Sequence, residues 1–317
     1  MPVLFGVVLL DLIGFGLVIP ILPFLSPELG ADKIDIAMII VGYAVCSGLC
    51  GPFWGRLSDR LGRKPVIMIC LSGAAISYVM LGLASELWMV YCARAFAGIM
   101  AGNFGVASAM MADITSPENR ARGMGVVGSA FGLGLVLGPV LGGLLAGDSG
   151  SFTLPCLVAG VMSLLAVIAA QLFLPESVSL KRRRENRTIQ RTQPAVSTLT
   201  LLRQTGNRLL AMQYVLHNTC VSGFTYIFPL WVGDILNWTA REVGIVFGIQ
   251  GAIMALMQGV LIGPMVRSVG EIPLLRVSIS CFFIGLVIAA FSDTTTFIVA
   301  SALITMTGAT MCMPVLN

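Results

Sequence analysis

Long, mostly uncharged apolar runs constrain this chain more than any other feature of its sequence. Each run approaches the roughly 20 residues that an α-helix needs to cross a bilayer. Only 11% of the 317 residues are charged, whereas a soluble domain carries about 25%. We therefore expect an all-α, multi-pass membrane protein. Ten spans can be marked, at about residues 3–25, 36–54, 66–85, 87–112, 123–147, 152–174, 209–233, 243–265, 272–291 and 295–316.

The distribution of cations predicts the orientation of these spans. The loops after the even-numbered spans, together with the first turns of the spans that follow them, carry sixteen lysine and arginine residues, whereas the opposite loops carry Lys33 and Arg241 only. Cytoplasmic loops of membrane proteins are enriched in such residues, so the N-terminus and the basic loops are expected in the cytoplasm. The first span lacks a basic leader and contains Asp11, so we interpret it as a spanning helix and not as a signal peptide.

A polar segment divides the chain into two parts. Residues 1–174 hold six spans and are expected to form an N-terminal bundle, and residues 175–207 form a basic linker. Residues 208–317 hold four spans of a second, incomplete bundle. Within the linker, the run from Lys181 to Arg191 is a candidate site for anionic lipid headgroups.

The two parts share a short motif. Residues 55–65 read GRLSDRLGRKP, and residues 263–273 keep both glycines and the proline when Gly270 is set on Gly62. Two copies in the same orientation are the parallel repeat of a transporter class that binds substrate between its halves. Because the second half is two spans short of the first, we expect a fragment or an incomplete gene product. A genuine ten-helix protein is the alternative.

The first copy of this motif is expected to be a tight polar hinge between two helices. Gly55 and Gly62 supply backbone freedom, and Pro65 suits the first turn of the next helix. The alternative is a plain topology anchor, in which the cations only hold the loop in the cytoplasm.

Four motifs resemble those of the major facilitator superfamily. Residues 55–65 are similar to its GxLxDRxGRKP loop signature, and residues 94–98 are similar to its RxxxG element. Residues 134–143 read GxxxGPxxGG, which resembles the signature of proton-coupled drug antiporters. The stretch from Asp11 to Leu17 resembles the start of the tetracycline/proton antiporter subgroup. The resemblance implies two six-helix bundles, here with about ten helices, acting as a monomer in a bacterial inner membrane.

Asp11 and Arg94 are ionisable residues inside predicted spans. An ionised carboxylate within hydrocarbon costs roughly 3 kcal/mol, so Asp11 can cycle between neutral and charged forms. We interpret Asp11 as the site of a proton or a cationic substrate; a structural carboxylate is the alternative. Arg94 needs a carboxylate, a carbonyl or a water-filled cavity as its partner. It would tune a carboxylate as access changes, or form a fixed structural pair.

The resemblance also implies a gate at the cytoplasmic face. In it, Asp59 and Asp113 belong to a charge network that latches the outward-open state. Opposite charges at an interface with two arrangements can bias one of them. The residues predicted for this gate are Gly55, Asp59, Arg60, Gly62, Arg63 and Asp113.

The fifth span is rich in small residues at helical spacing. Gly134, Gly138 and Gly142 recur every fourth residue and allow close helix contact. Pro139 removes a backbone hydrogen bond and kinks the helix, and Gly143 completes the motif. We expect this helix to seal the interface between the halves against proton leak. Tight packing without coupling is the alternative.

Further polar residues within the spans are candidates for hydrogen bonding in a cavity. We place Asn103, His217 and Gln250 with Asp11 and Arg94 at the proton or substrate site. The other candidates are Gln171, Gln213, Asn218 and Gln258. For each residue, a structural hydrogen bond between helices is the alternative.

Several kinds of chemistry are not expected. The sequence contains no P-loop, H-E-x-x-H or G-x-S-x-G motif, so neither an enzyme nor an ATP site is predicted. The eight cysteines form no CxxC pair and His217 is the single histidine, so we expect no metal and no cofactor. An embedded chain is not expected to bind nucleic acid. Any pumping must therefore draw on an ion gradient.

The favoured function is proton-coupled efflux of small amphipathic, tetracycline-like compounds by alternating access. The expected partners are this substrate, protons and the lipid bilayer. A metabolite uniporter or symporter of the same fold is one alternative, and a truncated membrane protein without transport activity is the other.

Overall fold

The structure is a computed structural model, and it describes residues 2–19, 21–22, 29–116, 120–146, 152–179, 183, 205–257 and 261–316. In this part of the chain the regular elements are all helices. Seven helical segments are long and apolar enough to cross a membrane, one of them (Leu87–Ile114) with a short interruption, so the prediction of an all-α membrane protein is confirmed. The chain forms two compact units. Unit 1 comprises residues 1–193 and 239–245, and unit 2 comprises residues 194–238 and 246–317.

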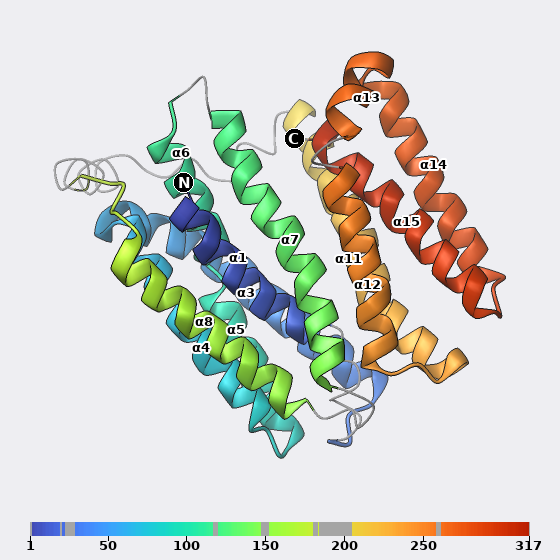
Figure 1. The fold of residues 1–317 in the computed structure, drawn as a ribbon, viewed down its shortest axis with the longest axis horizontal. Helices are drawn as coiled ribbons and strands as arrows, with labels where there is room; N and C mark the ends of the chain where they lie inside the picture. The colour runs from blue at the N-terminus through green and yellow to red at the C-terminus, as the bar shows by residue number, and fades with distance from the viewer. Residues whose placement is uncertain are drawn as a thin grey trace. The chain divides into compact units, whose positions relative to one another are not determined.

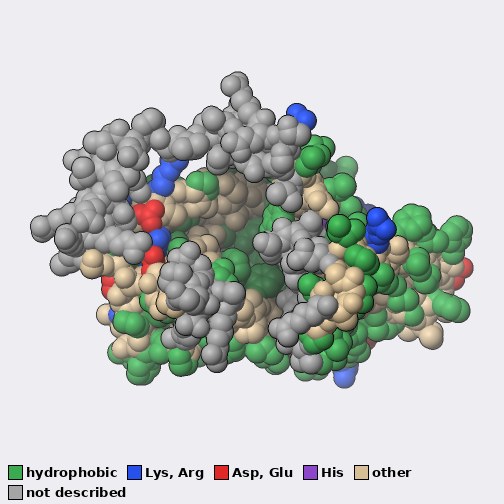
Figure 2. Space-filling view, turned by 90° about the horizontal axis from the view of Figure 1, so that it is seen from above, with side chains coloured by type: hydrophobic (Ala, Val, Ile, Leu, Met, Phe, Trp, Pro, Cys, Tyr) green, Lys and Arg blue, Asp and Glu red, His purple; other side chains and the backbone are tan. Residues whose placement is uncertain are grey.

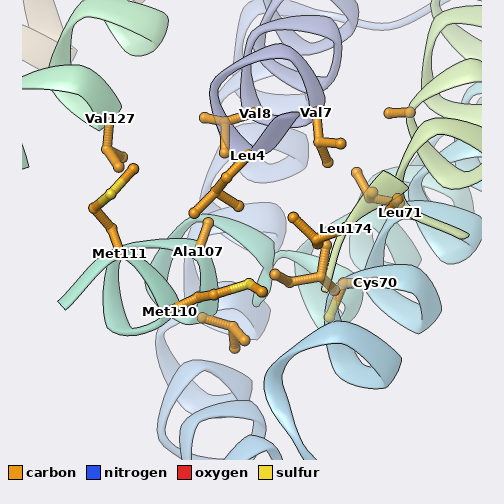
Figure 3. Close-up of a cluster of buried hydrophobic side chains, with 14 of the residues drawn as sticks. Leu4, Val7, Val8, Cys70, Leu71, Ala107, Met110, Met111, Val127 and Leu174 are labelled. Carbon is orange, nitrogen blue, oxygen red and sulfur yellow. The ribbon is translucent and has the colours of Figure 1, made fainter. Parts of the chain in front are cut away.

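Unit 1 is built around α1, which lies along both α7 and α8, while α4 lies along α5 and α8 (Figure 1). Its helices are α1 (Pro2–Val18), α3 (Lys33–Leu61), α4 (Arg63–Gly82), α5 (Leu87–Met100), α6 (Asn103–Ile114), α7 (Arg120–Ala146) and α8 (Thr153–Phe173). The core between these helices is apolar: Leu4 and Val7 of α1 belong to one buried cluster with Leu71 of α4 and Met110 of α6 (Figure 3).

The fourth predicted span is not one helix, because it is broken at Ala101 and Gly102. In a continuous helix the carbonyl of Ile99 would accept a hydrogen bond from the chain four residues on. Here the indole Nε1 of Trp54 donates to that carbonyl at 2.6 Å. A Cβ on Gly102 would collide with the same indole ring. The side chain of Trp54 therefore fills the break, and α6 starts afresh at Asn103.

The predicted hinge in residues 55–65 is shorter than expected. Helix α3 continues to Leu61, and only Gly62 leaves the helical conformation, with a φ of 108°. Gly55 lies inside α3, where an added Cβ would meet nothing within 4 Å. The prediction that Gly55 acts as a hinge is therefore wrong. Pro65 lies in the first turn of α4, as its position after the glycine predicted.

Unit 2 repeats part of this plan. Its helices are α11 (Thr205–Leu236), most of α12 (Ala240–Leu256), α13 (Ile262–Val269), α14 (Glu271–Ala290) and α15 (Thr295–Leu316). Helices α4 and α14 each have 20 residues and each follow a glycine of positive φ, 108° at Gly62 and 89° at Gly270. The predicted parallel repeat is thus present in the backbone. The eighth predicted span covers α12 and the start of α13, and residues 258–260 between these helices lie outside the described residues.

Equivalent faces of the two repeats differ in exposure. Val7 of α1 is 1% exposed, whereas Val215, its equivalent on α11, is 62% exposed. Leu71 of α4 is 1% exposed, whereas its equivalent on α14, Ile279, is 55% exposed. In unit 1 these faces lie against α7 and α8. The described residues of unit 2 include no helices in the corresponding places, so its apolar faces are uncovered there.

Replacing Gly62 with alanine should lower the apparent melting temperature of the purified protein in detergent micelles. A positive φ costs a non-glycine residue about 1–3 kcal/mol, and the new Cβ would collide with Glu176 and Arg183. Thermal unfolding followed by intrinsic fluorescence measures the change.

Two glycines provide matched controls for this substitution. Gly270→Ala should cost less than Gly62→Ala, because the nearest atom to the new Cβ is Cδ of Pro273 at 3.9 Å. Gly55→Ala should be neutral or slightly stabilising, because alanine is preferred over glycine in a helix by about 0.5–1 kcal/mol. Equal effects at all three positions would contradict the assignment of Gly62 as the hinge.

Candidate functional site

Asp11 lies in the middle of α1, with 8% of its surface exposed. The side-chain amide of Asn103 donates a hydrogen bond to Oδ2 of this carboxyl group. Asn103 is the first residue of α6, so the break after α5 brings its amide to α1. The structure thus joins two of the residues that were predicted for the proton or substrate site.

Arg94 projects from α5 into the same bundle and is also buried. Its guanidinium carbon lies 4.5 Å from the ring centroid of Tyr43 on α3, which is a cation–π distance. The ring of Tyr43 in turn lies 6.0 Å from the ring of Phe15 on α1. Within the described residues, Nε of Arg94 has no hydrogen-bond partner. We expected a polar partner for Arg94, and the aromatic face of Tyr43 is a contact that the sequence did not predict.

Tyr78 of α4 completes a set that we call the interior polar cluster: Asp11, Tyr43, Tyr78, Arg94 and Asn103. Tyr78 is buried and lies within electrostatic reach of both Asp11 and Arg94. A carboxyl group and a guanidinium held in an apolar interior respond strongly to any added charge, because little solvent screens them. The cluster can therefore hold a proton or a cation on Asp11.

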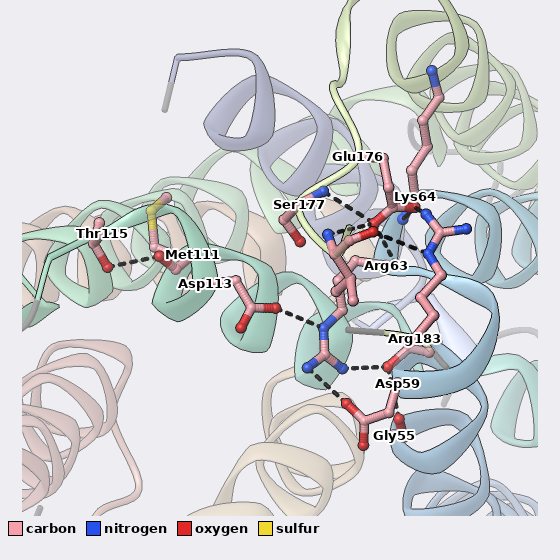
Figure 4. Close-up of polar contacts among 12 residues, drawn as sticks. Gly55, Asp59, Arg63, Lys64, Met111, Asp113, Thr115, Glu176, Ser177 and Arg183 are labelled. Carbon is pink, nitrogen blue, oxygen red and sulfur yellow. Dashed lines mark hydrogen bonds and ion pairs between the residues drawn. The ribbon is translucent and has the colours of Figure 1, made fainter. Parts of the chain in front are cut away.

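A second charged site lies where α3 ends and α4 begins, and Arg63 is at its centre (Figure 4). Nη2 of Arg63 lies 2.8 Å from Oδ1 of Asp59, and Nε lies 3.0 Å from Oδ2 of Asp113. Nη1 donates to the hydroxyl of Ser58. The side chains of Arg63 and Asp113 are each 11% exposed, so their pairing is screened less than a surface pair. Three predicted gate residues thus meet, and they join α3, α4 and α6.

Glu176, just after α8, is a functional candidate that the sequence did not predict. Its carboxylate accepts hydrogen bonds from the backbone N–H groups of Arg63 at 2.9 Å and Lys64 at 3.3 Å. It also pairs with Nη2 of Arg183 at 2.9 Å (Figure 4). A carboxylate at this place satisfies amides that the first turn of α4 leaves without partners and interacts favourably with the helix dipole. The available signal was an acid directly after the sixth span.

Two other predicted gate residues, Arg60 and Gly62, lie next to the charged site around Arg63. Arg60 lies on the last turn of α3 with an exposed side chain, and Gly62 contributes its backbone conformation. Viewed from above relative to Figure 1, acidic and basic side chains adjoin one another at one side of this face (Figure 2). Most of the run from Lys181 to Arg191, and Gln258, lie outside the described residues.

The glycines of α7 bring this helix into backbone contact with α1. A Cβ on Gly138 would lie 2.5 Å from Cα of Gly16, and a Cβ on Gly16 would lie 2.9 Å from the carbonyl oxygen of Gly134. A Cβ on Gly142 would collide with the backbone of Leu17. Larger residues at these positions would therefore push the two helices apart.

Gly143 faces a different partner, the first turn of α12. A Cβ on Gly143 would lie 2.6 Å from the carbonyl oxygen of Ala240 and 3.1 Å from Cα of Arg241. Residues 239–245 belong to unit 1. Pro139 lies inside α7, with its Cδ next to Gly16. The motif thus packs against two partners, and the sequence spacing alone did not distinguish them.

The predicted residues of the second half lie in unit 2, outside the interior polar cluster. His217 of α11 is half-buried and lines a cavity of about 180 Å³ with Gln213 and with Ser278 of α14. Gln250 of α12 has a buried Oε1 without a hydrogen-bond partner among the described residues. Among all the residues that the structure describes, in both units, no group of three or more His, Cys, Asp or Glu residues is arranged to hold a metal ion.

The chain is similar in sequence and in fold to known membrane transport proteins. A family model described as Major Facilitator Superfamily matches residues 4–317. The tetracycline resistance protein, class H, of Pasteurella multocida is 29% identical over 314 residues, which cover 98% of this chain and 78% of that protein. The class C protein of Escherichia coli is 32% identical over 307 residues, covering 92% and 73%. The crystal structure of the human organic anion transporter MFSD10 (TETRAN) has a TM-score of 0.75 at 24% identity, covering 99% and 83%.

Replacing Gly138 with alanine should destabilise the protein by about 1–3 kcal/mol, the usual cost of overpacking. The new methyl group would meet the backbone of Gly16, which cannot move without shifting α1. Gly132→Ala is the matched control on the same helix, because a Cβ there meets nothing within 4 Å. Thermal unfolding in detergent should separate the two variants, and equal melting temperatures would contradict the close contact of α1 and α7.

Glu176→Gln should destabilise the protein by about 1–2 kcal/mol, because hydrogen bonds to a charged group are replaced by neutral ones. Arg183→Gln should cost less, since the carboxylate keeps its backbone donors at the start of α4. The double variant should be no less stable than Glu176→Gln alone, because the two residues act through one carboxylate. If Arg183→Gln proves the more damaging single change, helix capping is not the main role of Glu176.

Proposed function

The chain belongs to the major facilitator superfamily, and from this premise we propose that it exports small amphipathic compounds of the tetracycline type in exchange for protons. One observation carries the proposal: the carboxyl group of Asp11 is buried inside a membrane-spanning bundle. Intramembrane carboxyl groups mark proton and substrate pathways, because keeping a charge there is costly. The printed names of two relatives, tetracycline resistance proteins of classes H and C, support the substrate class.

In the proposed cycle Asp11 alternates between a protonated and an ionised form. The amide of Asn103 donates to the carboxyl group and so supports the ionised form when the proton leaves. Arg94 is the cation of the same cluster, and its contact with Tyr43 keeps it buried without neutralising its charge. An ionised Asp11 can then accept a cationic group of the substrate, so that proton and substrate compete for one carboxylate.

The charged site around Arg63 supports a gate in this proposal. We place this end of unit 1 in the cytoplasm of a bacterial cell, because sixteen of the nineteen cations of the chain lie in the predicted cytoplasmic loops or in the helix ends that adjoin them. Asp59 and Asp113 share the guanidinium of Arg63. Breaking either pair removes a charge-assisted contact from a partly buried carboxylate, so the network favours one arrangement of the bundle over others.

The proposal also covers the energy source, the partners and the oligomeric state of the protein. The protein needs no cofactor, because the proton gradient supplies the energy, and its partners are the substrate, protons and the bilayer. It acts as a monomer. The alternative of a metabolite uniporter differs in one measurable respect, since a uniporter does not move protons with its substrate.

Asp11→Asn should abolish tetracycline efflux driven by a pH gradient in proteoliposomes, because an amide cannot bind and release the coupling proton. Exchange of labelled for unlabelled substrate without a gradient should be affected less, because that reaction needs no net proton movement. Asp293→Asn changes an exposed carboxylate and serves as the control. Undiminished gradient-driven efflux in Asp11→Asn would contradict the proposal. Wild-type transport at a rate independent of the pH gradient would favour a uniporter.

A further inference from the structure

A cavity of about 610 Å³ lies on the face of unit 1 that α4, α5 and α8 form. Its lining is apolar apart from Ser72 and from one end, where Lys64 and Gln171 lie, and includes Met68, Ile69, Ile76, Phe96 and Met100. Ile69 and Ile76 are exposed, so the cavity opens away from the bundle. The helices that form it belong to segments long and apolar enough to cross a membrane. The medium around such a face is the hydrocarbon of the bilayer, so the cavity is shaped for an apolar chain.

Lys64 closes this cavity at the end near Arg63. Its Nζ donates to the backbone carbonyl of Gln171 on α8 at 2.8 Å. An ammonium group has three donors, and among the described residues Lys64 forms no ion pair. Glu176, which binds its backbone N–H, is already paired with Arg183. A cation that lacks an acidic partner therefore stands at the mouth of an apolar groove.

The cavity has the length of one bilayer leaflet. From Lys64 to Ile76, α4 advances about 18 Å at about 1.5 Å per residue, and half of the hydrocarbon core measures about 15 Å. At Ile76 this cavity meets a second one of about 430 Å³, which continues to Trp88. Trp88 is exposed, as aromatic residues at a membrane interface are. The cavity at Lys64 thus corresponds to the leaflet on the basic side of the protein.

The internal repeat shows that this combination is not a general property of the fold. When α14 is set on α4, Ile272 takes the place of Lys64, and Ser280 takes the place of Ser72. The second half therefore keeps the small residue of the groove but has no cation at the position of Lys64, and its nearest cation along the chain, Arg276, takes the place of Met68.

We propose that unit 1 carries a binding site for one phospholipid with a net negative headgroup, with the phosphate at Lys64 and an acyl chain along α4 between α5 and α8. Lysine at a membrane surface favours anionic over zwitterionic headgroups. The depth of the groove restricts the chain to one leaflet. The inference depends on the membrane-spanning fold and is independent of which substrate the protein transports.

The test is a titration of the purified protein with phosphatidylglycerol or phosphatidylcholine in detergent micelles, with bound lipid counted by native mass spectrometry. We expect one phosphatidylglycerol to bind about fivefold more tightly than phosphatidylcholine. Lys64→Gln should remove this preference and leave phosphatidylcholine binding unchanged, because the groove is intact. Ser72→Phe should weaken the binding of both lipids, because the ring fills the groove.

Matched variants keep the result interpretable. Lys33→Gln removes a lysine from the start of α3, and Ser280→Phe makes the same substitution at the equivalent position of α14. Both should bind lipid like the wild type. Ser72→Leu replaces Ser72→Phe if gel filtration shows that the phenylalanine variant is misfolded.

The proposal is overturned if the wild type binds both lipids alike, or if Lys64→Gln keeps the preference. It is also overturned if Ser72→Phe dissociates a dimer that added lipid leaves intact, since a second copy then covers the groove.

Discussion

The guanidinium of Arg63 connects the ends of three helices, and the arrangement of unit 1 at that end depends on it. Its side chain binds Asp59 of α3 and Asp113 of α6, while its backbone N–H is bound by Glu176 after α8. These groups can converge only because Gly62 turns the chain with a positive φ and has no side chain to obstruct Glu176. A topology anchor would need cations here but not an arginine side chain that is 11% exposed and held between two carboxylates. This geometry is the basis of the proposed gate.

Two features organise the interior of unit 1. One is the close contact of helices at glycines, and the other is the break between α5 and α6. Gly16 and Gly138 let α1 and α7 touch through their backbones. Trp54 fills the break between α5 and α6, and the break directs Asn103 to Asp11. The burial of a carboxyl group in this setting is costly, and the amide of Asn103 offsets part of that cost. A group so placed responds to protons or cations, which is why the proposed transport function rests on Asp11.

The outer surface of the bundle differs from its interior in what it offers to other molecules. The groove along α4 has one charged end, at Lys64, and an apolar course beyond it. This surface faces lipid, so its apolar residues are suited to acyl chains. Where Lys64 adjoins them, the groove also selects for an anionic headgroup. The second half has the groove serine but not the lysine. The two repeats have therefore diverged on their lipid-facing side as well as in the charges of the shared motif.

The sequence by itself determined the membrane-spanning class, the parallel repeat and the superfamily, because hydropathy, loop charge and glycine spacing are local properties of the chain. It also singled out Asp11, Asp59 and Arg63, since charges are conspicuous among apolar residues. Only the tertiary structure decided their partners: Asn103 for Asp11, Tyr43 for Arg94 and Glu176 for the start of α4. It also divided the fourth predicted span at residues 101–102. Hydropathy did not mark this break, because neither of these two residues is charged. These partners lie far apart along the chain, and helix packing alone brings them together.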